Sequence, residues 1–355
     1  MVWCYALLVS YEDTGADLCD WHRVVFLSEA TLIQASHFFR EVDVVKWTLS
    51  SRSDPAAVGG ENPAPQLREI CFLHVCHCAV YLTQLERGAH SDSHVGKGPF
   101  PGILDTYILK GGPFELRAAL LAKKGFAVLA LAYQNYQDLP KKADKFHLEY
   151  FEEGLDFLRR QPEVKGQKIG LLSISKSGDL ALSMSTFLPD ITATVWINGC
   201  NANSVVPLYY KHMCIPPLMF DLKKKKPTAS GLVDMLDVMN DPMSKEGLPT
   251  VIPIERAPAS FMFIASEDDM NWRSVYHAKL ACDRLKAHGK NNYELVKYEK
   301  AGHFIEVPYM PFCLATFHVV LEQAVLFGGE PKAHSEAQVD AWQRVIRFFK
   351  KTLSS

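Results

Sequence analysis

The chain has 355 residues, of which 48% are hydrophobic and 22% are charged. This balance is ordinary for a globular protein and excludes a largely disordered chain. Its 38 Lys and Arg residues against 40 Asp and Glu residues give a formal net charge of −2, which argues against a basic nucleic-acid binder.

Cysteine usage and the chain ends bear on the cellular compartment. Nine cysteines without regular spacing indicate free thiols in a reducing environment, because an odd number cannot all pair within the chain. No apolar run reaches the roughly 18 residues of a membrane-spanning helix, and neither a signal peptide nor a C-terminal peroxisomal signal is recognisable. We predict a cytoplasmic protein without a membrane span, with a peroxisomal location as the alternative.

Residues 1–97 show no clear periodicity. Apolar runs at 24–27 and 71–82 are separated by a turn-rich stretch at 50–65 that holds Ser, Asp, Gly, Asn and Pro. The second run contains five residues of metal-ligand type, which are Cys71, His74, Cys76, His77 and Cys78. A structural zinc site usually needs two well-spaced pairs, so we predict no metal site here. We treat residues 1–97 as a divergent N-terminal segment of uncertain fold.

From residue 98 onward, short apolar runs alternate with amphipathic segments. Runs rich in Val, Ile, Leu and Phe without alternation are typical of buried parallel strands, and they occur at 102–107, 126–132, 168–174, 193–197, 260–265 and 293–298. Apolar residues at spacings of three and four predict helices at 114–123, 148–160, 180–187, 275–287 and 337–349. This rhythm predicts one α/β domain over 98–355, with a mostly parallel sheet and helices on both faces.

The segment 169–180 places a serine between a predicted strand and a predicted helix. Ser175 stands where the nucleophile elbow G-x-S-x-G has its serine. There the N–H of Lys176 can point at a developing oxyanion, and the helix N-terminus favours negative charge. Ser173 and Ser177 replace the two glycines of the motif, so a strand-to-helix turn with capping serines fits this segment equally well when it is taken alone.

Two further strand ends supply the acid and the base that a serine nucleophile needs. Asp269 lies in a carboxylate-rich loop after the strand 260–265, and His303 follows Gly302 in the loop after the strand 293–298. The order serine, acid, histidine along the chain accompanies the nucleophile elbow. We therefore predict a catalytic triad of Ser175, Asp269 and His303 at one edge of the sheet.

Residues 98–353 resemble the family of acyl-CoA thioesterases and bile-acid-CoA:amino-acid N-acyltransferases. The resemblance rests on GPFPGI at 98–103, GFAVLALAY at 125–133, HLEYFEE at 147–153, ISK at 174–176, AGHFIEVPY at 301–309 and GGEPKAHSEAQVDAW at 328–342. The run DDMNWRS at 268–274 looks more like the thioesterases, and it favours Asp269 over Asp268 as the acid. The resemblance implies an α/β-hydrolase fold and hydrolysis of fatty acyl-CoA to free fatty acid and CoA-SH through an acyl-enzyme, with no metal or other cofactor.

Two alternatives to a thioesterase remain open. The N-acyltransferases of the family typically use Cys as nucleophile, so Ser175 favours hydrolysis over transfer to an amino acid. The oxyanion loop retains Gly111, which we predict as an oxyanion donor beside Lys176, but Ile108 and Lys110 stand where the family has glycines. The family's N-terminal immunoglobulin-like domain is not recognisable in residues 1–97. A non-catalytic member that binds acyl-CoA or a partner is therefore the other alternative.

Overall fold

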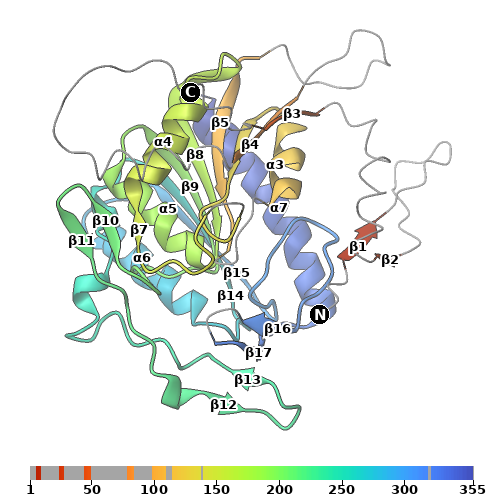
Figure 1. Cartoon of the computed structure of the whole chain (residues 1–355), viewed down its shortest axis with the longest axis vertical. Helices are drawn as coiled ribbons and strands as arrows, with labels where there is room; N and C mark the ends of the chain where they lie inside the picture. The colour runs from red at the N-terminus through yellow and green to blue at the C-terminus, as the bar shows by residue number, and fades with distance from the viewer. Residues whose placement is uncertain are drawn as a thin grey trace.

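The computed structural model describes residues 98–108, 114–136, 139–318 and 321–354 and, before them, the backbone of four strands (Figure 1). These strands are β1 (Tyr5–Leu8), β2 (Val24–Leu27), β3 (Val44–Thr48) and β4 (Cys78–Thr83). β1 and β2 pair antiparallel with each other. The Cys and His residues at 71–77 lie outside the described residues, so the prediction made for them stays a prediction.

The largest sheet in the described part of the chain has eight strands in the order β15-β14-β9-β8-β5-β6-β4-β3. Neighbouring strands are parallel from β15 to β6. The parallel strands are β5 (Phe100–Thr106), β6 (Ala127–Leu131), β8 (Val164–Ile174), β9 (Ile191–Ile197), β14 (Ser260–Ser266) and β15 (Tyr293–Tyr298). All six predicted strands are therefore present.

Two strands from before residue 98 complete this sheet. β4 pairs antiparallel with β6, where Cys78 lies opposite Leu131, and β3 pairs antiparallel with β4. The apolar run at 71–82 thus contains most of a strand beside β6. The division into residues 1–97 and a catalytic domain over 98–355 stays a prediction, and the sheet itself extends across that boundary.

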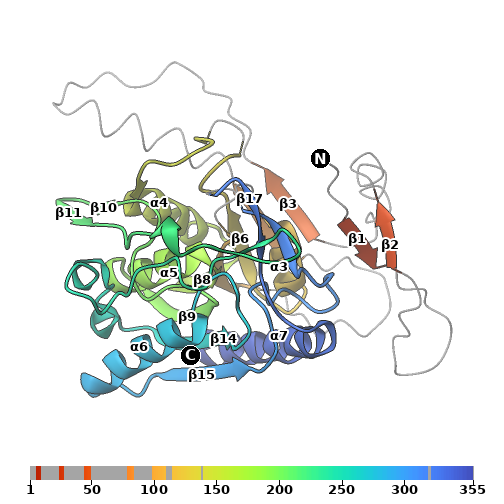
Figure 2. The same cartoon turned by 90° about the horizontal axis from the view of Figure 1, so that it is seen from below.

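Helices cover both faces of the sheet (Figures 1 and 2). α4 (Leu148–Arg159), α5 (Lys176–Phe187) and α6 (Ser274–Ala287) lie on one face, and α3 (Glu115–Ala122) and α7 (Pro331–Leu353) lie on the other. Every predicted helix is present. α7 extends beyond the predicted 337–349 at both ends, and its N-terminal extension starts with Pro331, which fits the first turn of a helix.

Each face has its own apolar core. Leu155 of α4 and Leu180 of α5 belong to the first core, and Ile103 of β5 and Phe349 of α7 belong to the second. The first ten residues of α5 are buried because α4 and the 3₁₀ turn η5 (Ile254–Arg256) also pack on this helix. The helix behind Ser175 is therefore enclosed on all sides.

Two smaller sheets have the orders β11-β10-β7 and β12-β13-β17-β16. Their strands are β7 (Phe146–His147), β10 (Leu208–Tyr210), β11 (Met213–Ile215), β12 (Lys226–Pro227), β13 (Val233–Asp234), β16 (Ala315–His318) and β17 (Gln323–Leu326), and the segments between β11 and β14 include the 3₁₀ turns η3 (Leu222–Lys224) and η4 (Leu248–Thr250). None of the described helices is long and apolar enough to cross a membrane.

The strand order reverses between β5 and β8. The chain runs from β5 to β6 on one side and then returns to place β8 on the other side of β5. In open α/β sheets, ligands bind outside the carboxyl ends of the strands where the order reverses in this way. Ser175 directly follows β8, and the predicted oxyanion loop follows β5.

Candidate active site

Ser175 occupies a strained backbone position between β8 and α5. Its φ of 59° and ψ of −130° lie in a region that costs a non-glycine residue about 1–3 kcal/mol and that persists only where the surroundings enforce it. Here the Ser175 N–H donates to the Ile197 oxygen at 2.9 Å, and the Gly178 N–H donates to the Ser175 oxygen at 2.8 Å. The strand-to-helix turn is therefore a nucleophile elbow in conformation, although its sequence departs from G-x-S-x-G.

The two serines that replace the motif glycines are accommodated without strain. Neither is among the residues with positive φ. Ser173 Oγ donates to the Val195 oxygen at 2.8 Å, and Ser177 Oγ lies 2.8 Å from the Thr106 oxygen and accepts a hydrogen bond from the Ile174 N–H at 2.9 Å. The close backbone approach occurs instead at Gly178, where a Cβ would lie 2.8 Å from the Trp196 indole nitrogen.

The structure brings Ser175, His303 and Asp269 together at the carboxyl ends of three parallel strands. Ser175 Oγ lies 2.8 Å from His303 Nε2, and His303 Nδ1 lies 2.7 Å from Asp269 Oδ2. An ionised carboxylate can only accept hydrogen bonds. His303 Nδ1 therefore carries the proton, and Nε2 presents its lone pair to the Ser175 hydroxyl.

Asp269 is held by its own loop. Its Oδ1 accepts hydrogen bonds from the N–H groups of Asn271 at 2.8 Å and Trp272 at 3.2 Å, and its Oδ2 accepts one from Ser274 Oγ. The Trp272 indole N–H donates to the Asn198 oxygen at 2.7 Å. The Asp269 carboxyl group is buried, and with His303 Nδ1 it accepts hydrogen bonds from four donors.

The loop that carries His303 is fixed from two sides. The Asn198 amide nitrogen donates to the His303 oxygen at 2.7 Å, and the His303 N–H donates to the Phe327 oxygen at 2.8 Å. The Phe327 ring also stacks on the imidazole, with centroids 5.5 Å apart. Gly302 is required because a Cβ there would lie 2.1 Å from the Gly328 oxygen.

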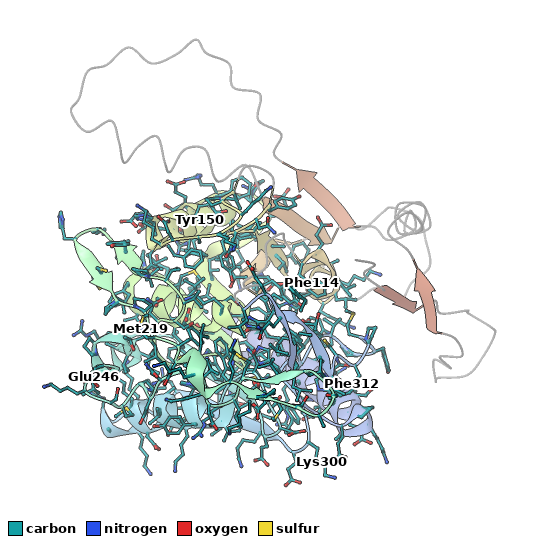
Figure 3. All side chains as sticks on the ribbon, turned by 60° about the horizontal axis from the view of Figure 1, so that its bottom comes forward. Phe114, Tyr150, Met219, Glu246, Lys300 and Phe312 are labelled. Carbon is teal, nitrogen blue, oxygen red and sulfur yellow. The ribbon has the colours of Figure 1, made fainter. Side chains whose placement is uncertain are left out.

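His334 of α7 supports the same loop from below. Its Nδ1 accepts from the Gly302 N–H at 3.0 Å, and its Nε2 donates to the Phe304 oxygen at 2.9 Å. Burial lowers the pKa of His334, which keeps the imidazole in the neutral form that can both accept and donate. Phe312, labelled in Figure 3, packs on the His334 ring with centroids 5.3 Å apart.

Lys176 has a backbone N–H at the start of α5 and a buried side chain. As the first residue of α5, its N–H has no intrahelical acceptor, and it adjoins Ser175. The side chain turns away into a buried ion pair with Asp179, with Nζ 2.8 Å from Oδ1, and Asp179 Oδ2 accepts from Ser204 Oγ at 2.6 Å. Burial raises the pKa of Asp179, and the Lys176 charge opposes that rise.

A second buried ion pair anchors the start of the predicted oxyanion loop. Arg117 of α3 pairs with Asp105 and donates to the Thr106 oxygen at 3.1 Å. Tyr107 donates to Glu306, three residues after His303. The pKa of Glu306 is raised by burial, which the nearby Arg117 charge opposes. This cluster links the end of β5 to the loop that carries His303.

Part of the predicted oxyanion loop lies outside the described residues. Lys110 and the predicted donor Gly111 fall in the undescribed segment 109–113, so their roles stay predictions. Ile108 is described; it is partly buried against the second core and is not among the residues with positive φ. Within the described residues, no group of three or more His, Cys, Asp and Glu side chains is placed to hold a metal ion.

The supporting roles of three residues were not predicted from the sequence. Ser274 and His334 lie within the family runs at 268–274 and 328–342, whereas Asn198 lies in none of the quoted runs, and all three contact the acid or the histidine loop. Asn198 offered one signal, because it directly follows β9 and so ends a strand beside β8 and β14. Ser274 and His334 lie in runs that indicated the family, but nothing in those runs assigned them a contact, since a serine at the start of a helix and a histidine within one are ordinary.

Comparison with known proteins identifies the family. The profile of the family described as "BAAT / Acyl-CoA thioester hydrolase C terminal" matches residues 146–355. The chain belongs to this family. The match includes Ser175, Asp269 and His303, and it confirms the resemblance drawn from the sequence motifs.

Curated members of the family share about half of their aligned residues with this chain. Human acyl-coenzyme A thioesterase 6 is 50% identical over 258 residues, which is 73% of this chain and 61% of that protein. Mouse peroxisomal succinyl-coenzyme A thioesterase is 45% identical over 260 residues, which is 73% of this chain and 62% of that protein. The chain thus spans about three fifths of the length of these relatives.

Solved structures bear on the fold of this family member. An acylaminoacyl peptidase in complex with Z-Gly-Gly-Phe-chloromethyl ketone has a TM-score of 0.50 at 16% sequence identity, over 78% of this chain and 39% of that chain. Together with the strand order, this likeness confirms the predicted α/β-hydrolase fold.

Proposed function

We propose that this chain is an acyl-CoA thioesterase in which Ser175 is the nucleophile, His303 the general base and Asp269 the residue that orients the histidine. The observation that carries the proposal is the pair of hydrogen bonds from Ser175 Oγ to His303 Nε2 and from His303 Nδ1 to Asp269, at 2.8 and 2.7 Å. The names of the relatives supply the substrate class, since they are acyl-coenzyme A thioesterases.

In the acylation step, His303 Nε2 acts as the base because Nδ1 carries the ring proton. Ser175 Oγ attacks the carbonyl carbon of the thioester while Nε2 takes the hydroxyl proton. The imidazolium that forms is stabilised by the Asp269 carboxylate at Nδ1. Collapse of the tetrahedral intermediate breaks the C–S bond, the CoA sulfur leaves with the proton from Nε2, and an acyl ester remains on Ser175.

The developing oxyanion needs donors on the side opposite His303. We assign one to the Lys176 N–H, which lies at the N-terminus of α5, where the helix dipole also favours negative charge. Gly111 is the second proposed donor, because its loop follows β5 next to β8. Ser177 supports this geometry, since its Oγ donates a hydrogen bond to the backbone oxygen of Thr106, the last residue of β5.

The domain and compartment assignments are parts of the same proposal. We place the catalytic domain at residues 98–355, with β3 and β4 extending its sheet. Four cysteines of the described residues are free thiols, which suits a reducing compartment and supports a cytoplasmic location. One relative is named as peroxisomal, so the peroxisome is the compartment to compare against.

Thiol release from palmitoyl-CoA tests the proposal. The full chain, Ser175→Ala and a matched control, Ser183→Ala, are purified and checked for folding by circular dichroism. Ser183 is a buried serine of the same helix whose hydroxyl bonds only the Asp179 oxygen one turn earlier. We expect release by the wild type and by Ser183→Ala, and none above background by Ser175→Ala. A folded wild type that releases no thiol from short, medium or long acyl-CoA would leave a non-catalytic family member.

A further inference from the structure

The amide of Asn271 borders the reacting nitrogen of His303. Its Nδ2 lies 3.3 Å from His303 Nε2, the atom that also faces Ser175 Oγ. The Asn271 backbone is fixed independently, because its N–H donates to Asp269 Oδ1. The side chain is therefore held at the centre of the triad by a loop that does not depend on it.

The oxygen of the same Asn271 amide accepts no hydrogen bond from the described residues. Asn271 Oδ1 is buried and has no hydrogen-bond partner among the described residues. A buried amide oxygen left in that state costs about 1–3 kcal/mol. Acylation of Ser175 gives no use for it, because the hydroxyl proton passes directly to Nε2. The acceptor is thus available for a group that enters the site at another stage.

Hydrolysis of the acyl-enzyme brings in a water molecule that can use such an acceptor. Once Ser175 Oγ is esterified, it no longer has a hydrogen to donate, and the lone pair of His303 Nε2 faces an incoming water instead. That water donates one hydrogen to Nε2 and has a second hydrogen that needs a partner. Asn271 Oδ1 belongs to the amide that already borders Nε2.

We propose that Asn271 is a catalytic residue of the deacylation step, where its Oδ1 accepts a hydrogen bond from the hydrolytic water. This inference rests on the proposed thioesterase function. The water oxygen attacks the ester carbon of acyl-Ser175 while one of its protons passes to His303 Nε2. The C–O bond to Ser175 then breaks, Oγ takes the proton from Nε2, and the carboxylic acid leaves with the oxygen of the water.

This role predicts that the two chemical steps respond differently to loss of the Asn271 side chain. Acylation needs the triad of Ser175, His303 and Asp269 and the oxyanion donors but not the Asn271 acceptor, so it is preserved. Deacylation loses the acceptor that orients the water, and we expect it to slow by about tenfold to a hundredfold. Loss of a residue that acts through Asp269, such as Ser274, slows both steps, because both need the same orientation of His303.

Rapid-mixing kinetics with palmitoyl-CoA separate the two steps. The full chain, Asn271→Ala, Asn271→Leu and Ser274→Ala are compared by the CoA released before steady state and by intact mass. For both Asn271 variants we expect a burst approaching one CoA per protein at the wild-type rate, a slow steady state, and a palmitoyl adduct on Ser175. For Ser274→Ala we expect slower acylation and no adduct. Asn271→Leu keeps a side chain of similar size, which separates loss of the amide from loss of packing.

Three results would overturn the inference, and they are distinguishable. If the wild type turns over and both Asn271 variants lose the burst and the steady state equally, Asn271 serves the oxyanion or the fold and not the water. Unchanged turnover in both variants leads to the same rejection. If the wild type neither releases CoA nor forms an adduct, the proposed function itself fails and the inference fails with it.

Discussion

Ser177 Oγ lies 2.8 Å from the backbone oxygen of Thr106, so the helix that follows Ser175 is tied to the end of the neighbouring strand. The same hydroxyl accepts a hydrogen bond from the Ile174 N–H at 2.9 Å. Both contacts are buried. Ser177, which departs from the nucleophile-elbow motif, therefore links the end of β5 to the end of β8 by hydrogen bonds. The proposed oxyanion donors Gly111 and Lys176 follow these two strand ends.

This relationship predicts that restoring the motif glycine harms the protein. Ser177→Gly and Ser177→Ala each remove the buried hydroxyl that accepts from the Ile174 N–H and lies beside the Thr106 oxygen, which loosens the end of β5. We expect each to lower the free energy of unfolding by about 1–3 kcal/mol and to reduce thioesterase activity. Urea unfolding and thiol release measure the two effects. Ser183→Ala, which removes only a bond to an already helical carbonyl, is the control, and a more active Ser177→Gly would contradict the assignment.

A methyl group at Gly302 should disable the histidine loop. The added Cβ would lie 2.1 Å from the Gly328 oxygen and 2.7 Å from the Phe327 oxygen, and the latter oxygen accepts the His303 N–H. Neither backbone oxygen can move as a flexible side chain does, so Gly302→Ala displaces His303. We expect a loss of about 1–3 kcal/mol in stability and at least tenfold in kcat.

Gly166→Ala is the matched control for this substitution. Gly166 has a φ of +67° and nothing within 4 Å of an added Cβ, so alanine there costs about 1–2 kcal/mol through backbone strain alone. The two variants are thus similar in stability but should differ in activity. Equal activity per folded molecule in the two variants would show that the position of His303 tolerates the displacement.

The fold was predictable because most strands of the large sheet are buried on both faces. β6 and β14 are almost entirely buried and read as apolar runs, whereas the edge strand β15 carries Glu294 and Lys297 and has no buried residue. Helical periodicity between the strands indicated the layer order. Before residue 98 apolar runs occur at 24–27 and 71–82, but no helical periodicity accompanies them, so they did not indicate a topology. β4 is an antiparallel strand beside β6, and its residues follow a run of Cys and His that carries no period of two.

The candidate triad was predictable from position in the sequence, whereas its support was not. Ser175, Asp269 and His303 each follow a predicted strand, so parallel pairing alone brings them to one edge. The contacts of His334 and Ser274 depend on how α7 and the acid loop pack in three dimensions. No spacing in the sequence predicts those contacts. From the motif alone, Ser177 was only a departure from G-x-S-x-G, and its hydrogen bonds could not be predicted.

Removal of the Arg117 charge should destabilise the domain strongly. Arg117 and Asp105 are both buried and pair with each other, and burial raises the pKa of Asp105 against the opposing effect of Arg117. Arg117→Met leaves a buried carboxylate without its partner, which costs about 3–5 kcal/mol. Arg344→Ala breaks a half-exposed pair with Asp340 and should cost less than about 1 kcal/mol. Urea unfolding of both variants checks the contrast, and similar losses would refute it.

The last prediction concerns acid pH and the buried His277. Its Nδ1 lies 2.8 Å from Asn201 Oδ1, an acceptor, so Nδ1 carries a proton. Burial lowers the pKa of His277 to about 4 from an ordinary 6.5. The unfolded chain therefore binds more protons than the folded chain between these two values, and stability falls as the pH drops through that window.

We expect His277 to account for a loss of about 3 kcal/mol between pH 6.5 and pH 4. His277→Asn keeps a donor toward Asn201 and removes the titrating group, so its stability should depend less steeply on pH. The measurement is urea unfolding of the wild type and the variant at half-unit steps from pH 7 to pH 4. Asn is smaller than His, so the variant loses some stability at every pH, and only the slope tests the idea. Parallel curves for the two proteins would assign the acid sensitivity to other groups, among which His318, with a pKa also lowered to about 4 by burial, is the next to replace.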